Sequence, residues 1–202
     1  MVKLVNQTIF SAKLKEKKLY IFNQKDIRAI FGVSAVAASG LLHRYKKRGF
    51  ILQLKRGLYV FPDALPPDVY IANKLYSPSY VSLEFALSYH SVIPETVYEI
   101  TSVTTKATRR FETLGKTFSY RKIKTLAFTG YEIQEQQGLS FNIADAEKAF
   151  VDVNYLRLTN QQKPLSRFNK EKLNSARAIK YASLFSNKKL TGIIKTTLQC
   201  SQ

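Results

Sequence analysis

The chain of 202 residues is predicted to fold as an α+β protein, in which helical and strand segments are grouped along the sequence. Residues 22–61 show helical apolar spacing followed by two short apolar runs that fit strands. Residues 97–105 are rich in β-branched side chains, which favour strands, and residues 118–123 and 126–133 also fit strands. Residues 143–158 return to helical spacing. Because 45% of the residues are hydrophobic, the chain can form a buried core.

Positive charge is concentrated at the two ends of the chain. Residues 1–65 contain 13 Lys and Arg against 3 Asp and Glu, residues 66–162 contain 10 of each, and residues 163–202 contain 9 against 1. These counts divide the net charge of +18 into +10, 0 and +8, and they suggest three domains with the same boundaries. A basic excess of this size indicates a polyanionic partner such as nucleic acid.

Two helices and a hairpin are predicted in the first block. Asn23 can cap a helix that stops at Gly32, and Ser34 can cap a second helix. The buried face of the second helix, with apolar residues at i, i+3, i+4 and i+7, consists of Ala38, Leu41, Leu42 and Tyr45. Residues 50–54 and 58–61 fit paired strands joined by a short basic turn. This order of elements is that of a winged helix-turn-helix.

The winged helix-turn-helix makes double-stranded DNA the first candidate partner. The second helix of this motif lies in the major groove, where its outward residues meet base edges. The candidate base-contacting residues are Ser34, Ala35, Ser39, His43 and Arg44. The candidate phosphate-contacting residues are Lys46, Lys47 and Arg48 at the helix end and Lys55 and Arg56 at the wing tip. Among the first group, Arg44 has the fork geometry that matches guanine O6 and N7.

Two alternative interpretations remain for this basic run. Lys and Arg also favour the solvated C-terminal ends of helices, where they interact with the helix dipole. Winged helices also serve as protein-binding modules, although the +10 charge of the first block favours DNA.

Further elements are predicted in the middle and last blocks. Helices are expected over residues 68–76, 80–90, 143–158, 170–185 and 188–199, and strands over residues 97–105, 118–123 and 126–133. The middle block is therefore a mixed α/β domain and the last block a basic helical tail. That tail could extend the DNA contact, meet an acidic partner or remain solvated.

Two other groups of polar residues have a functional and a structural interpretation. Residues 101–110 combine hydroxyls with Lys106, Arg109 and Arg110, which could contact phosphate or an acidic partner, or form a charged edge strand. The acids near residue 147 could hold a metal in a nuclease, although pairing across a helix turn is the more common role of such residues. The acids are Asp145, Glu147 and Asp152, and Lys148 accompanies them.

Several classes of site and location are not expected from this sequence. It contains no P-loop, no GxGxxG, no GxSxG and no Cys/His set with metal-ligand spacing, so we expect no enzyme, no cofactor and no metal site. The single cysteine, Cys200, fits a reducing compartment. No apolar run is long enough to span a bilayer and the start lacks a signal peptide. We therefore expect a cytoplasmic protein.

Five short segments follow one another along residues 55–149: KRGLY at 55–59, PSYVSLEFALSYH at 78–90, IPE at 93–95, TSVTTKATR at 101–109 and IADAEKA at 143–149. Together they resemble the AbiE antitoxin (AbiEi) family of type IV toxin–antitoxin systems. Each segment alone is common, but their order and spacing over residues 22–158 are specific. Residues after 158 match no part of the family pattern.

The resemblance implies two activities. An N-terminal winged helix would bind inverted repeats in the operon's own promoter and repress it. The following domain would counter a cognate nucleotidyltransferase toxin, directly or indirectly, and the segments around Glu84 and Glu147 would be structural signatures of that domain. The alternative is a plain winged-helix regulator whose later domain senses a ligand or mediates dimerisation.

Overall fold

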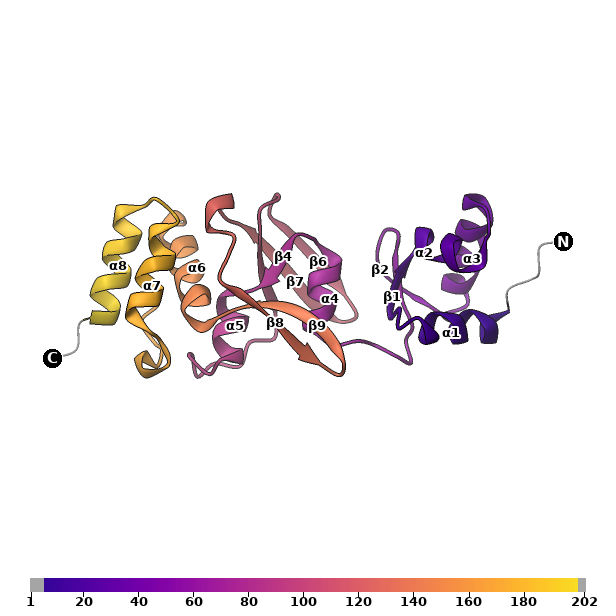
Figure 1. Cartoon of the computed structure of the whole chain (residues 1–202), viewed down its shortest axis with the longest axis horizontal. Coiled ribbons are helices and arrows are strands. Elements are labelled where there is room, and N and C mark those ends of the chain that lie inside the picture. The colour runs from indigo at the N-terminus through magenta and orange to yellow at the C-terminus, as the bar shows by residue number, and fades with distance from the viewer. Residues whose placement is uncertain (1–5, 200–202) are drawn as a thin grey trace. The chain divides into compact units, whose positions relative to one another are not determined.

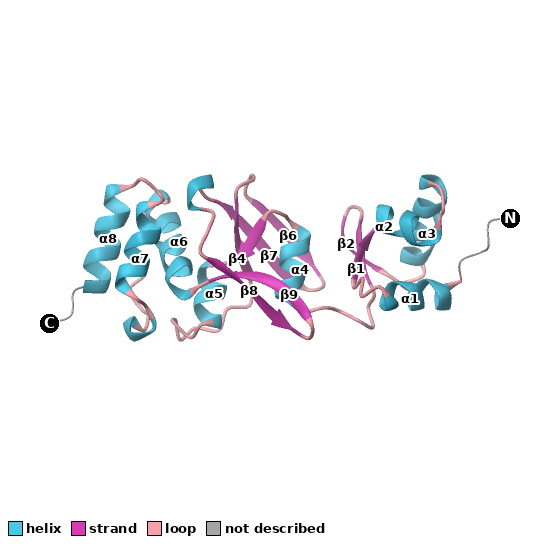
Figure 2. Cartoon of the chain, in the orientation of Figure 1, coloured by secondary structure: helices cyan, strands magenta, loops and turns pink. Residues whose placement is uncertain are grey.

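The computed structural model describes residues 6–199, and Cys200 lies outside this range. The chain forms two compact units, the first ending at Pro67 and the second beginning at Asp68 (Figure 1). Both units contain helices and strands (Figure 2), which confirms the expected α+β class.

The first unit contains three helices and a small antiparallel sheet. In chain order its elements are α1 (Gln7–Glu16), β1 (Ile21–Asn23), α2 (Gln24–Phe31), α3 (Ala35–Lys47), β2 (Leu52–Lys55) and β3 (Leu58–Val60). The strand order is β1-β3-β2, so the last strand pairs with the other two. The hairpin of β2 and β3 follows α3 directly, as the sequence predicts.

Aromatic side chains form the centre of the first unit's core. The Phe10 ring contacts the rings of Phe22, Phe31 and Tyr45 with centroid distances of 5.8, 5.5 and 5.0 Å. The predicted buried face of α3 is confirmed, because Ala38, Leu41, Leu42 and Tyr45 all pack into this core. Aromatic pairs of this kind add stability beyond the apolar area that they bury. The core therefore fixes which side of α3 faces outward.

The second unit is built on a six-stranded mixed sheet. Its elements are α4 (Asp68–Leu75), β4 (Ser79–Val81), α5 (Leu83–Tyr89), β5 (Ile100–Thr104), β6 (Arg109–Thr113), β7 (Lys116–Lys122), η1 (Thr125–Ala127), β8 (Tyr131–Gln136), β9 (Leu139–Ala144), α6 (Ala146–Thr159), η2 (Lys170–Lys172), α7 (Ser175–Ser183) and α8 (Lys188–Gln199). The strand order is β6-β7-β5-β4-β9-β8, with β6 and β8 at the edges. The β4–β9 and β5–β7 pairs are parallel, and the others are antiparallel.

Helices cover both faces of this sheet. Tyr120 of β7 donates a hydrogen bond to the Ala72 carbonyl of α4 at 2.6 Å. Its neighbour Ser119 lines a groove together with residues of α5 and α6. Because successive side chains of a strand point to opposite faces, α4 covers one face and α5 and α6 the other. The helices α7 and α8 pack on α6, so residues of the basic C-terminal block are part of this unit (Figure 1).

The predicted helix over residues 80–90 is wrong at its start. Tyr80 and Val81 belong to β4, an interior strand that pairs with both β5 and β9, and the helix begins at Leu83. A run of apolar residues fits a buried strand and a buried helix equally well, and only the pairing partners distinguish them. For the same reason, Ile143 is in β9, and the helix predicted from this residue begins at Ala146.

Candidate nucleic-acid interface

Local hydrogen bonds set the junction between α2 and α3. The Asn23 side chain accepts from the backbone N–H groups of Lys25 and Asp26, and the Asp26 carboxylate accepts from the Asn23 N–H at 2.8 Å. Gly32 ends α2 with φ +63°, which a glycine adopts without strain. The Gln24 side chain then donates to the Ala35 carbonyl at 2.6 Å and ties the beginning of α2 to that of α3.

The outward face of α3 carries the five residues predicted to contact bases, and all five are exposed. Ser34 caps the helix, since its hydroxyl accepts from the Ala37 N–H at 3.2 Å. The side chains of Ser39, His43 and Arg44 make no hydrogen bond or ion pair with any residue in the range 6–199. Their polar groups are therefore open to a ligand, while Ser34 has a structural task as well.

The structure adds Val36 to this face, on which the helical period already places Gly40. Val36, Gly40, His43 and Lys47 lie at i, i+4, i+7 and i+11, opposite the buried face, and form one line along α3. Val36 is 84% exposed. The helical period alone indicates the position of Val36, although its side chain is apolar. An exposed valine can contact a thymine methyl group, and a glycine lets a base edge approach the backbone.

The cations at the end of α3 differ in their surroundings. Lys46 donates to the Gln53 side chain of β2 at 2.5 Å, which connects the helix to the hairpin. Lys47 and Arg48 are exposed, and their side chains have no partner among the described residues. These two are therefore the more available phosphate contacts.

The hairpin turn consists of Arg56 and Gly57, and Gly57 has φ +80°. Lys55 is the last residue of β2 and is half-buried, whereas Arg56 is exposed at the tip. A register shift between Gln53 and Lys55 interrupts the pairing of β2 with β3. Such a shift increases the local twist of a hairpin and changes the direction of its tip.

The three cations predicted as a second contact do not form one cluster. Lys106 donates to the Ser77 carbonyl at 2.6 Å and lies 5.8 Å from the centre of the Tyr76 ring. Arg109 and Arg110 are neighbours on the edge strand β6, so their side chains point to opposite faces of the sheet. The structure thus places these residues on a charged edge strand and the loop before it.

The acids near residue 147 have partners within the second unit. Asp145 caps α6 by accepting from the Lys148 N–H at 2.7 Å, and it accepts from Arg177 at 2.8 Å and Tyr181 at 2.6 Å. Glu147 accepts from the Asn174 N–H at 2.9 Å. These bonds attach α7 to the beginning of α6. The polar residues Asp145 and Glu147 therefore have a structural role in this segment.

A buried ion pair lies one turn further along α6. Lys148 and Asp152 are both fully buried and pair with each other, and Asp152 also accepts from Ser82 at 2.9 Å and Tyr80 at 3.2 Å. Burial and the neighbouring carboxylate raise the pKa of the Tyr80 hydroxyl well above its usual value, so it stays a donor. Within residues 6–199, no group of His, Cys, Asp and Glu side chains is arranged to hold a metal ion.

One comparison with known protein families gives a match, and it covers most of the first unit. The family model for "Transcriptional regulator, AbiEi antitoxin" matches residues 12–62, from within α1 to just beyond β3. No curated protein matches the chain. In the described part of the chain, every helix is too short or too polar to cross a membrane.

Proposed function

From the membership of residues 12–62 in the family of AbiEi antitoxin transcriptional regulators, we propose that the chain binds its own promoter through a winged helix-turn-helix and represses its operon. The observation that carries this proposal is the outward face of α3. That face presents hydrogen-bonding side chains and unpaired cations next to a hairpin with an exposed arginine at its tip. The proposal assigns the chain no catalysis and places its action in the bacterial cytoplasm.

In this proposal α3 enters the major groove. Ser39, His43 and Arg44 meet base edges, and Val36 offers an apolar contact to a thymine methyl. Lys47, Arg48 and Arg56 neutralise phosphates on either side of the groove. Each neutralised phosphate adds about 0.9 to the slope of log affinity against log salt. Sequence choice therefore depends on α3, and most of the salt dependence on its end and the hairpin tip.

A mobility-shift experiment tests the promoter proposal. The full chain is titrated into a DNA fragment from upstream of its own gene and into a scrambled fragment of the same composition, at two salt concentrations. Preference for the upstream fragment that persists at the higher salt is expected, because base contacts are less screened than phosphate contacts. Equal and steeply salt-dependent binding to both fragments would overturn sequence-specific recognition.

We further propose that the second unit counters a nucleotidyltransferase toxin in the manner of a type IV antitoxin. This part rests on the family of the first unit and on the segment resemblance over residues 78–149. Growth rescue tests it: the chain is co-expressed with the nucleotidyltransferase encoded beside it. Rescue that persists when promoter binding is weakened, as in an Arg44→Ala variant, would separate the two activities. Promoter binding without growth rescue would support the alternative function, a plain transcription regulator.

A further inference from the structure

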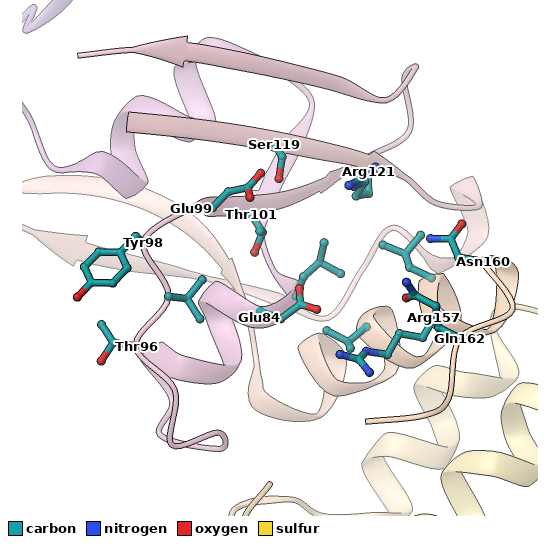
Figure 3. A pocket seen from close by; sticks show the side chains of 14 residues that line it. Glu84, Thr96, Tyr98, Glu99, Thr101, Ser119, Arg121, Arg157, Asn160 and Gln162 are labelled. Atoms are coloured by element: carbon teal, nitrogen blue, oxygen red, sulfur yellow. The ribbon is translucent and has the colours of Figure 1, made fainter. Parts of the chain in front are cut away.

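A groove of about 540 Å³ lies in the second unit between the sheet and the helices α5 and α6 (Figure 3). Leu83, Thr101, Ser119 and Val153 line it and are buried. The groove uses none of the residues proposed to contact DNA. Loop residues before β5 and after α6 complete its lining.

Each wall of the groove contributes one acid and one base. On the sheet side these are Glu99, in the loop just before β5, and Arg121 of β7; on the helix side they are Glu84 of α5 and Arg157 of α6. Figure 3 shows the two carboxylates toward one end of the groove and the two guanidinium groups toward the other. The groove is therefore electrically polarised along its length.

These four charged side chains are not satisfied by one another. Glu84, Glu99 and Arg121 make no hydrogen bond or ion pair with any residue that the structure describes. Arg157 donates to the Lys163 carbonyl at 3.3 Å, but its buried Nε has no partner. Like charges that face each other across a groove repel, so each end favours an ion of opposite sign. A ligand that supplies both ions would relieve both repulsions.

The spacing of the charges limits the size of that ligand. In the register of β5 and β7, Arg121 lies opposite Val103, four residues beyond Glu99. At about 3.3 Å per residue, these backbone positions are about 13 Å apart. Long side chains reduce the gap between the charged groups, but adjacent charges on one ligand would not reach both ends. The lining also includes Val97 and Leu156, which suit an aliphatic stem.

We infer that this groove binds a small zwitterion, either an ω-amino carboxylate or a short peptide. Its carboxylate lies between Arg121 and Arg157, and its ammonium group lies between Glu84 and Glu99. Arginine is suited to the carboxylate because its planar fork can donate two parallel hydrogen bonds. The buried Ser119 hydroxyl, which has no partner among the described residues, is available to a polar group in the middle of the ligand.

The experiment is an amide NMR titration of the full ¹⁵N-labelled chain. The probes are glycine, 4-aminobutanoate, 6-aminohexanoate, 8-aminooctanoate and triglycine, and the controls are hexanoate, hexylamine and inorganic phosphate. Saturable shifts are expected at amides of β5, β7, α5 and the end of α6, and glycine is expected to bind most weakly of the zwitterions. Hexanoate and hexylamine, each lacking one charge, should bind at least about tenfold more weakly than 6-aminohexanoate.

Two pairs of variants locate the contacts. Arg121→Gln and Glu99→Gln should each weaken the affinity for the tightest-binding zwitterion by about tenfold or more. Arg109→Gln on β6 and Glu135→Gln on β8 are matched controls, since both are exposed, have no partner among the described residues and lie outside the groove. These two variants should bind the same zwitterion with the affinity of the unchanged chain. The amide spectrum of each variant reports whether its fold is intact.

Three outcomes would overturn the inference. The first is the absence of saturable shifts at the groove for the whole series of zwitterions. The second is equal affinity for hexanoate or phosphate, which would indicate an anion site alone. The third is unchanged affinity in Arg121→Gln and Glu99→Gln. None of these outcomes affects promoter binding by the first unit, so the two proposals can fail separately.

Discussion

Arg44 differs from the other exposed side chains of α3 in its hydrogen-bonding geometry. Its guanidinium group presents several N–H donors in a rigid plane, and it has no partner among the described residues. Lys47 nearby offers a single mobile charge, which attracts a phosphate but does not distinguish bases well. Ser39 and His43 can each make single hydrogen bonds. Base discrimination by this helix should therefore depend on Arg44 more than on its neighbours.

Replacement of Arg44 by alanine should reduce specific DNA binding by about 1–3 kcal/mol and relax the preference at one base pair. Mobility shifts on the promoter fragment and on single-base variants of it measure both effects. Arg109→Ala, which removes an exposed arginine in the second unit, is the control and should change neither. Unchanged specific binding in Arg44→Ala would mean that α3 is not the helix that reads bases.

Gly40 should separate the stability of the first unit from its DNA binding. An added Cβ would meet only the Arg44 Nη1 atom at 3.8 Å, so Gly40→Ala should stabilise α3 by up to about 1 kcal/mol. Gly40→Leu should also leave the unit folded but block the approach of a base edge to the helix. Thermal unfolding and mobility shifts measure the two properties. Full DNA binding by Gly40→Leu would contradict the outward face described for α3.

At the scale of elements, the hairpin of β2 and β3 should act through phosphate contacts alone. Replacement of Arg56 by alanine should weaken binding to promoter DNA and to scrambled DNA about equally. It should also lower the slope of log affinity against log salt concentration by about one. Binding isotherms at several salt concentrations give the slope for each DNA. A selective loss on the promoter fragment would show instead that the hairpin tip reads sequence.

The helix α6 depends on its buried ion pair. Removal of one partner, as in Lys148→Met or Asp152→Leu, leaves the other charge buried without compensation and should destabilise the second unit by about 3–5 kcal/mol. The double variant should recover most of this loss, because neither charge is then left buried. Chemical denaturation of the two single variants and the double variant forms the complete cycle. Equal losses in all three would show that the hydrogen bonds of Asp152 to Tyr80 and Ser82 matter more than the pair.

The elements that the sequence predicts well are those defined by local signals. Asn23 and Ser34 cap their helices as predicted, since a cap involves residues only two or three positions apart. The strand at Tyr80 was mistaken for helix because its identity depends on pairing with Val103 and Ile143, far away in the sequence. Long-range pairing leaves no local pattern.

The candidate sites also divide into one defined by local signals and one defined by long-range contacts. The buried face of α3 could be predicted by counting residues, and so could its outward line. The groove in the second unit could not, because Glu84, Glu99, Arg121 and Arg157 come from four separate parts of the chain. Only the folded sheet and its helices bring them to one cavity. A cluster of residues distant in sequence needs the tertiary structure to be seen.

At the scale of the whole molecule, the first unit should fold without the second. Its aromatic core is formed entirely by residues within the first unit. A fragment of residues 1–67 should therefore show a cooperative thermal transition, although a domain of this size is only marginally stable. It should prefer the same promoter sequence as the full chain. Circular dichroism and mobility shifts test this, and an unfolded fragment would show that the second unit is required.

The edge strand β8 carries charges that oppose its pairing with the same strand of a second copy. Edge strands present unpaired backbone groups that can pair with another copy and start aggregation. The edge strand β8 exposes Ile133, but Glu132 and Glu135 flank it, and β6 carries Arg109 and Arg110. Two β8 edges therefore repel each other through these glutamates, which opposes the pairing of two copies over the exposed Ile133.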